Sequence, residues 1–323
     1  MIRLGRLMQS EVMFKRVIEI AQNIKDEKWK SIALGNLGLV YNTQGKLDKA
    51  EEMHLKSLEI KERLGLQEGM ANSYGNLGIV YKTRGELDKA EEMYYKVLEI
   101  EEKLGRQESI ANAYGNLGVI YNTRGDMDKA EKMFKKIEKM HEELGNQEGL
   151  ATDYGNLGLI YDKKGDLDKA QEMHKKALEI DKKIGHLEGV ARHSSNLGVI
   201  YQKLGGVDKA EDMHNKSLEI NKKLGRLEGM AINYCNLGLI YMDKGDLDKA
   251  EEMYIKALEI DQKIGRLEGQ AIQYANLGSV YRQRGDNKKA RQYWEKAVEL
   301  YKRIGMPHEV EKVEGWIEGI DTE

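Results

Sequence analysis

The sequence predicts an all-α fold, a solenoid built from stacked pairs of antiparallel helices. The tripeptide Asn-Leu-Gly recurs every 40 residues in seven copies, which begin at Asn36, Asn76, Asn116, Asn156, Asn196, Asn236 and Asn276. So strict a period over most of a chain is typical of stacked-repeat proteins. Within each copy the apolar residues follow helical spacing, and glycines separate the helical stretches.

The third copy shows how one repeat gives two helices. Tyr114 and Tyr121 fall on one face of a first helix, helix A, which Gly125 is expected to end in a left-handed turn. Asp126 is a favourable N-cap for a second helix, helix B. Phe134 marks the buried face of helix B. Each repeat is therefore a helix pair, with roughly four to five turns in each helix.

The pattern resembles the tetratricopeptide repeat (TPR). The TPR signature has an aromatic-x2-Leu-Gly-x2-Tyr motif in helix A and Ala-x3-aromatic in helix B, met here by Tyr74, Leu77, Gly78, Tyr81, Ala90 and Tyr94. The period is 40 rather than 34 residues, and glycine replaces the usual proline after helix B. These features resemble the Pins/LGN class of adaptors and, more distantly, kinesin light chains. The resemblance implies a right-handed TPR superhelical solenoid with a concave groove, lined by helix A, that binds extended peptide segments.

The repeat alignment divides the chain into three parts. Residues 1–29 form an N-terminal half-repeat, a helix B without its helix A; residues 30–305 form seven repeats; residues 306–323 form a C-terminal capping helix. Gly5 aligns with Gly45, so a helix break is expected there. Two interpretations of the first helix stay open. Its apolar residues Phe14, Val17 and Ile18 mediate self-association, or they pack on the next helix with modest exposure.

The predicted groove carries constant and variable rows of residues. The repeated Asn forms one constant row, beside an aliphatic strip of Leu39, Ile79, Val119, Leu159, Val199 and Leu239. Outer rows vary between repeats and include the candidate specificity residues Asn72, Asn112, Arg192, Lys82 and Asn122. An Asn amide can pair with any peptide backbone. Layers ~10 Å apart meet an extended chain rising ~3.3 Å per residue, so the ladder could hold roughly 20 residues. The alternative is that each Asn bonds a neighbouring helix.

Composition excludes several classes of protein. Charged residues make up 33% of the chain and the formal net charge is −3, without the basic footprint of a nucleic-acid-binding protein. Most of the basic residues near the ends of helix A, such as Arg84 and Arg124, are explained by the helix dipole, and the alternative that stays open is a weak preference for an acidic ligand. The chain has one cysteine, Cys235, and no apolar run long enough to cross a membrane. A cytoplasmic protein without membrane contact is expected.

No residue pattern indicates catalysis, a cofactor or a metal. His54, His174 and His214 share a repeat position held elsewhere by aromatic residues, so they are expected to replace packing aromatics. The helix A glycines are expected to permit close packing rather than to bind phosphate. We therefore expect a peptide-binding adaptor scaffold, not an enzyme. The alternatives are the sensor arm of a larger regulator, which binds a short signalling peptide, and a self-assembling scaffold.

The fifth repeat departs from the others at two positions. Ser194 stands where most repeats have Tyr, and Gly206 stands where several repeats have Asp at the start of helix B. These differences predict a missing aromatic side chain in the core between helices and a missing N-cap.

Overall fold

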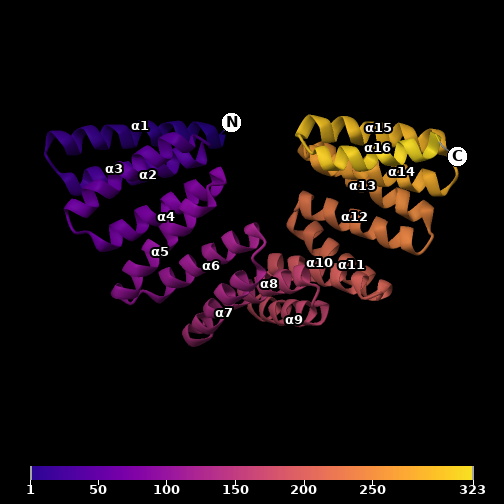
Figure 1. Cartoon of the computed structure of the whole chain (residues 1–323), viewed down its shortest axis with the longest axis horizontal. Helices are drawn as coiled ribbons and strands as arrows, with labels where there is room; N and C mark the ends of the chain where they lie inside the picture. Colours follow the sequence, from indigo (N-terminus) through magenta and orange to yellow (C-terminus); the bar gives the residue numbers. More distant parts are fainter. Residues whose placement is uncertain (1, 322–323) are drawn as a thin grey trace. The chain divides into compact units, whose positions relative to one another are not determined.

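The computed structural model describes residues 2–321, which form sixteen α-helices and no strand (Figure 1). The chain divides within α8 into two compact units, residues 1–153 and residues 154–323. The helices up to that point are α1 (Ile2–Asn23), α2 (Glu27–Thr43), α3 (Leu47–Arg63), α4 (Gln67–Arg84), α5 (Leu87–Leu104), α6 (Gln107–Arg124), α7 (Met127–Leu144) and α8 (Gln147–Lys164). The helices that follow are α9 (Leu167–Ile184), α10 (Leu187–Lys203), α11 (Val207–Leu224), α12 (Leu227–Asp243), α13 (Leu247–Ile264), α14 (Leu267–Gln283), α15 (Asn287–Ile304) and α16 (Pro307–Asp321).

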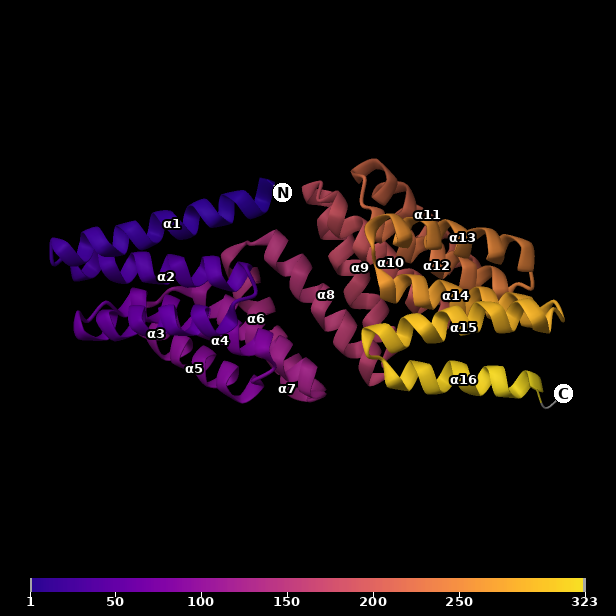
Figure 2. The same ribbon diagram turned by 90° about the horizontal axis from the view of Figure 1, so that it is seen from above.

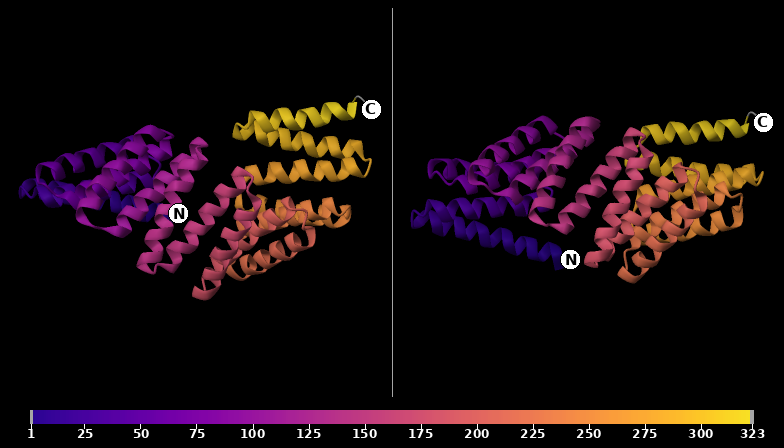
Figure 3. Two further views of the ribbon diagram at one scale, coloured as in Figure 1. Left: turned by 60° about the horizontal axis from the view of Figure 1, so that its bottom comes forward. Right: turned by 90° about the horizontal axis from the view of Figure 1, so that it is seen from below.

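Within each unit, helices that follow one another in the chain pack side by side. In the N-terminal unit α2 packs on α3, α4 on α5 and α6 on α7, and the helix B elements α1, α3 and α5 also pack on the helix A that follows each of them. Figure 2 shows the antiparallel arrangement of α1, α2 and α3. The same alternation holds from α9 to α16 in the C-terminal unit, where Figure 3 shows the last helix beside the one before it. The prediction of an all-α repeat fold is confirmed.

The turns between helices follow the predicted chemistry. Gly125 ends α6 with φ +82°, in the left-handed region, and its N–H donates to the carbonyl of Asn122. Asp126 then caps α7, because its carboxylate accepts a hydrogen bond from the N–H of Lys129 at 3.1 Å. Gly206 offers no such side chain, and α11 begins without a side-chain cap. The missing cap of the fifth repeat is thus confirmed.

The core of each repeat is a close contact between a glycine of helix A and a large side chain of helix B. A Cβ atom added at Gly118 would lie 2.8 Å from Cζ of Phe134. A Cβ atom added at Gly38 would lie 2.6 Å from Cε1 of His54, which is fully buried. The histidine therefore occupies the place of an aromatic residue, as the sequence predicted. The helix A glycines permit this approach, since any larger residue would collide.

The first helix differs from its prediction in two respects. Helix α1 continues through Gly5, where a break was expected, and α2 begins at Glu27, before the predicted boundary at residue 30. Phe14 and Ile18 pack against Leu37 and Tyr41 of α2 rather than facing outward. Glycine alone does not end a helix, because a helical backbone accepts it at a cost of about 1 kcal/mol.

The expected core role of the tyrosines two residues before the Asn row is only partly met, since Tyr154 is buried and the others are half-buried. Tyr74 and Tyr114 are half-buried at the edge of the repeat, where Lys96 and Lys136 lie over their rings. They do not fill the core between the helices. In the fifth repeat, Ser194 is fully buried at this position and its hydroxyl has no hydrogen-bond partner. Amphipathic residues such as Tyr often lie at such edges, because the ring packs against other side chains while the hydroxyl remains in contact with water.

Candidate peptide-binding site

The repeated Asn residues lie half-buried on helix A of each repeat. Asn116 accepts a hydrogen bond from Lys82 Nζ at 3.0 Å and donates to the carbonyl of Asn112 at 3.0 Å. Asn276 donates to the sulfur of Cys235 at 3.6 Å. Within residues 2–321 the other five side chains make no hydrogen bond: Asn36, Asn76, Asn156, Asn196 and Asn236. Most of the row is therefore available to a ligand.

An exposed aliphatic strip accompanies the Asn row in each unit. In the N-terminal unit Leu39, Ile79 and Val119 are 42%, 37% and 39% exposed. In the C-terminal unit Leu159 and Leu239 are similarly exposed, while Val199 is half-buried. Exposed apolar side chains in a row provide surface whose burial would favour binding, at about 25 cal/mol per Å².

Two cavities open beside the Asn row, one in each unit. A cavity of about 200 Å³ lies between α4 and α6 over α5, and its lining includes the predicted residues Asn72, Asn76, Ile79, Asn112 and Asn116. A cavity of about 240 Å³ lies between α10 and α12 over α11, and its lining includes the predicted residues Arg192 and Asn196. The structure thus brings together predicted row and outer-row residues from neighbouring repeats at each cavity.

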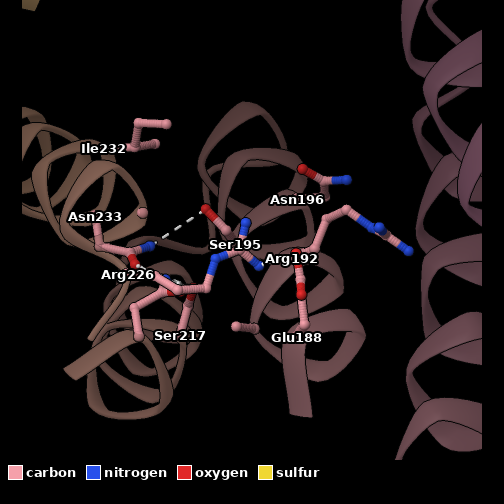
Figure 4. Close-up of a pocket in the computed structure, with 11 residues that line it drawn as sticks. Glu188, Arg192, Ser195, Asn196, Ser217, Arg226, Ile232 and Asn233 are labelled. Carbon is pink, nitrogen blue, oxygen red and sulfur yellow. Dashed lines mark hydrogen bonds and ion pairs between the residues drawn. The ribbon is translucent and has the colours of Figure 1, made fainter. Parts of the chain in front are cut away.

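The cavity of the C-terminal unit has a polar floor. Asn233 accepts hydrogen bonds from Ser217 Oγ at 3.1 Å and from Asn221 Nδ2 at 2.9 Å. Its own Nδ2 donates to Ser195 Oγ at 3.3 Å, and Figure 4 shows Asn233 and Ser195 facing each other while Arg192 extends away from them. Each residue of this floor already has a partner, so it offers a ligand only remaining lone pairs and hydroxyl rotors.

The remaining predicted residues lie at the ends of helix A. Lys82 is half-buried, and burial lowers its pKa. Asn122 is also half-buried, and its carbonyl closes the turn at Gly125.

Cys235 is half-buried, and burial raises the pKa of its thiol to about 11, so it stays protonated at neutral pH.

The basic residues at the ends of helix A hold consecutive repeats together. Arg84 donates to Glu51 at 2.7 Å and to Asp48 at 2.9 Å, both on helix B of the preceding repeat. Lys244 pairs in the same way with Glu211 and Asp208. The helix dipole explanation is therefore incomplete, because these cations have specific carboxylate partners. These paired cations have little left to offer an acidic ligand.

A variable row of buried polar residues on helix B was missed by the sequence reasoning. It lies near the end of helix B and contains Lys61, Glu101, His141, Asp181, Asn221 and Asp261. Most members bind a residue of the next helix A or of the turn before it. Lys61 donates to Ser73 at 2.9 Å, and His141 lies 2.6 Å from Asp153, whose pKa burial raises to about 6. The available signal was variation at a single position among otherwise similar repeats.

The N-terminal edge exposes apolar residues other than the predicted ones. Met8 and Val12 of α1 are 62% and 68% exposed. Met13 and Ile20 are also more than half exposed, whereas the equivalent Met93 and Ile60 are buried in complete repeats. Phe14, Val17 and Ile18, by contrast, are half-buried within the unit. Any association through this edge would therefore involve mainly Met8, Val12, Met13 and Ile20.

Over residues 2–321, no helix is both long and apolar enough to span a bilayer. In the same stretch, no three His, Cys, Asp or Glu side chains come together as a metal site would require.

The helix pairs resemble the fold of proteins of known structure. The apo form of the quorum sensor NprR from B. thuringiensis has a TM-score of 0.70 at 18% identity, over 92% of this chain and 86% of that chain. BtubC (BKLC) from P. vanneervenii has a TM-score of 0.59 at 26% identity, over 68% of this chain and 90% of that chain. A signal transduction ATPase (STAND) with a tetratricopeptide repeat sensor, from Pyrococcus horikoshii, has a TM-score of 0.65 at 19% identity, over 91% of this chain and 46% of that chain.

Sequence comparison agrees with the structural likeness. No curated protein sequence matches the chain. The model of the tetratricopeptide repeat family matches it in seven overlapping segments, residues 1–63, 31–103, 69–143, 109–183, 154–223, 189–263 and 229–303. These segments together cover residues 1–303, and the chain therefore belongs to the tetratricopeptide repeat family.

Proposed function

We propose that this chain is a protein-binding adaptor that holds an extended segment of a partner protein on its helix A face. The observation that carries the proposal is the Asn row. Five of its seven side chains lack a partner among residues 2–321, although each carries two donors and an acceptor. A row of such amide groups can form hydrogen bonds with the repeating N–H and C=O groups of a peptide backbone.

The neighbouring residues give this binding its affinity and its preference. The exposed strip of Leu39, Ile79 and Val119 would lose contact with water when a peptide covers it. The outer rows differ between repeats, so they would select among peptide side chains. Binding of this kind involves shape, hydrogen bonding and apolar burial, without a chemical step.

A second form of the proposal is a sensor that binds a short signalling peptide. NprR is described as a quorum sensor, and the repeats of the STAND protein as a sensor. The two cavities beside the Asn row support this form, since each is large enough for one peptide side chain. A sensor and an adaptor would share the same binding face and differ in the length of the peptide.

Replacing three members of the Asn row should weaken peptide capture. We expect a library of random 12-residue peptides, displayed on phage, to yield binders of the wild-type chain. The triple variant Asn156→Ala, Asn196→Ala, Asn236→Ala should bind a selected peptide about 10-fold or more weakly, since each lost hydrogen bond contributes about 0.5–1.5 kcal/mol. Peptide affinity is measured by fluorescence polarisation, and helix content by circular dichroism.

Asn215→Ala is the matched control, because Asn215 is exposed on α11, outside the row. It should leave affinity unchanged. The proposal would be contradicted if the triple variant bound as tightly as the wild type. Loss of helix content in the triple variant would instead show that the row is structural.

A further candidate function is self-association through α1, which the exposed Met13 and Ile20 favour. We expect light scattering to show concentration-dependent association that Val12→Lys with Ile20→Lys removes, because the substitutions place charge in an apolar contact. Leu144→Lys, at an exposed apolar position on α7, is the control and should not change the association. A wild-type chain that stays monomeric at high concentration contradicts this candidate.

A further inference from the structure

The cavity of the N-terminal unit has a carboxylate at its floor. Glu101 of α5 is only 2% exposed, while Asn72 and Asn112 on the cavity walls are exposed and Asn76 and Asn116 are half-buried. Glu101 is therefore the most buried polar residue of the lining. Its carboxylate accepts no hydrogen bond from any residue between 2 and 321, and its Oε2 atom is buried without a hydrogen-bond partner. A buried carboxylate that lacks hydrogen bonds is costly for a protein to maintain.

The equivalent positions in other repeats show what Glu101 lacks. Asn221 bonds Asn233, which lies 12 residues later on the next helix A. Lys61 bonds Ser73 at the same spacing. The corresponding residue for Glu101 is Ala113, which has no polar group to offer. At Glu101, therefore, the next helix A supplies no polar partner, and the side chain borders the cavity instead.

The nearest cation does not satisfy Glu101. Arg106 Nε lies 3.5 Å from Glu101 Oε2, while its Nη1 lies 2.9 Å from Glu68. Two carboxylates thus share one guanidinium, which leaves a formal charge of −1 in the cluster. The carboxylate of the equivalent Asp261, unlike that of Glu101, accepts a hydrogen bond from an arginine, since Arg266 Nε donates to it at 2.7 Å. Burial raises the pKa of Glu101, which is the expected response of a carboxylate with too few donors.

We propose that this cavity receives a basic side chain, arginine or lysine, of the peptide bound on the helix A face. The inference rests on the proposed function and adds the chemical class of one peptide residue. The cation would neutralise the cluster of Glu68, Glu101 and Arg106. An arginine can also give the Glu101 carboxylate two parallel hydrogen bonds in a water-poor site. The carbonyl oxygens of the wall asparagines can accept its remaining donors.

The test uses a peptide selected from the 12-residue library by the full chain. We expect the selected peptides to share one basic residue at a fixed position. Replacing that arginine with citrulline, which keeps the shape without the charge, should weaken binding to the wild type about 10-fold or more. Glu101→Gln should bind the arginine and citrulline peptides equally and retain the affinity of the wild type for the citrulline peptide.

Asp261→Asn is the matched control, because Arg266 Nε already donates a hydrogen bond to one oxygen of that carboxylate. It should keep the full preference for arginine. The inference is overturned, and the proposed function stands, if wild type and Glu101→Gln show the same ratio of arginine to citrulline affinity. Failure of the Asn row variant to weaken binding would instead overturn the proposed function. A library that yields no peptide contradicts both.

A second measurement does not depend on a selected peptide. Capped arginine, N-acetyl-arginine methylamide, should shift the backbone amide signals of α4 and α6 around the cavity in NMR spectra of the wild type. The capped citrulline should not, and Glu101→Gln should abolish the arginine effect. Equal shifts from both compounds would overturn the inference. Circular dichroism confirms that Glu101→Gln keeps its helices.

Discussion

Replacing Gly118 with alanine should lower the free energy of unfolding by about 1–3 kcal/mol, the usual cost of overpacking a core. The new Cβ atom would lie 2.8 Å from Cζ of Phe134, closer than a methyl group and a ring carbon can approach. Phe134 is 3% exposed and has no room to withdraw. The repeat must therefore separate its two helices or turn the ring out of its preferred rotamer.

A double-mutant cycle separates this collision from general effects of the substitution. Phe134→Ala alone should cost about 3–5 kcal/mol, because it leaves a cavity in the repeat. Gly118→Ala combined with Phe134→Ala should cost less than the sum, since the new methyl group partly fills that cavity. Urea unfolding followed by circular dichroism measures each variant. Gly315→Ala on α16 is the control, because its added Cβ meets nothing within 4 Å. Additive costs would contradict the proposed contact.

The second large effect concerns the buried histidines below neutral pH. His54, His174 and His214 are at most 1% exposed, and burial lowers the pKa of each from 6.5 to about 4. At pH values between these two pKa values, the three histidines bind protons in the unfolded chain but stay neutral in the folded chain. Stability should therefore be full above about pH 6.5 and be lost as the pH falls toward 4. The loss reaches about 3 kcal/mol for each ring when fully protonated in the unfolded state.

Neighbouring charges change this profile only in part. Lys61 further disfavours a charged His54, while Asp162 slightly favours a charged His174. Asp153 acts in the opposite direction, since burial raises its pKa to about 6 and the folded chain then gains a proton more readily than the unfolded chain. Burial also raises the pKa of Glu101, but these two carboxyl groups do not offset the buried imidazoles, which include His193 with its pKa lowered to about 3. The net effect of acid therefore remains destabilising.

Urea unfolding at several pH values between 7.5 and 4.5 tests this expectation. His214→Phe should reduce the pH dependence of the free energy of unfolding by the contribution of one titrating group. Phenylalanine is chosen because Phe134 already fills the equivalent position in another repeat. The substitution should also stabilise the chain, since the ring nitrogens of His214 have no partner in the region described. His308→Phe is the control at an 89% exposed side chain and should not change the slope. A wild-type profile that is flat from pH 6.5 to 4.5 would contradict the prediction.

Several features of the fold were predictable from local sequence. Gly125 and Asp126 mark the end of one helix and the start of the next, and both behave as predicted. Local backbone preferences decide such positions, so no knowledge of distant contacts is needed. Gly5 shows the limit of this reasoning. It aligns with turn glycines elsewhere but lies within α1, because a glycine permits a left-handed turn without requiring one.

The proposed binding face was predictable in outline and not in detail. The sequence indicated the Asn row and the aliphatic strip, because both repeat with the period of the fold. It did not indicate that Arg84 pairs with Glu51 of the preceding repeat. Nor did it indicate that Tyr81 donates to the same carboxylate at 2.8 Å. Such pairs depend on how two helices pack, which spacing along one helix does not reveal.

The sequence by itself determined the family, the helix pairs, their turns and the repeated row of Asn side chains that we propose binds a peptide. These follow from short-range rules and from a 40-residue period that repeats them. Only the tertiary structure decided which buried polar groups find partners. Glu101 and Asp261 occupy the same position in the repeat, yet Arg266 lies 2.7 Å from Asp261 while Arg106 is shared with Glu68 and stays 3.5 Å from Glu101. The physical reason is that a hydrogen bond depends on distances of tenths of an ångström between side chains from different segments, and those distances are set by packing.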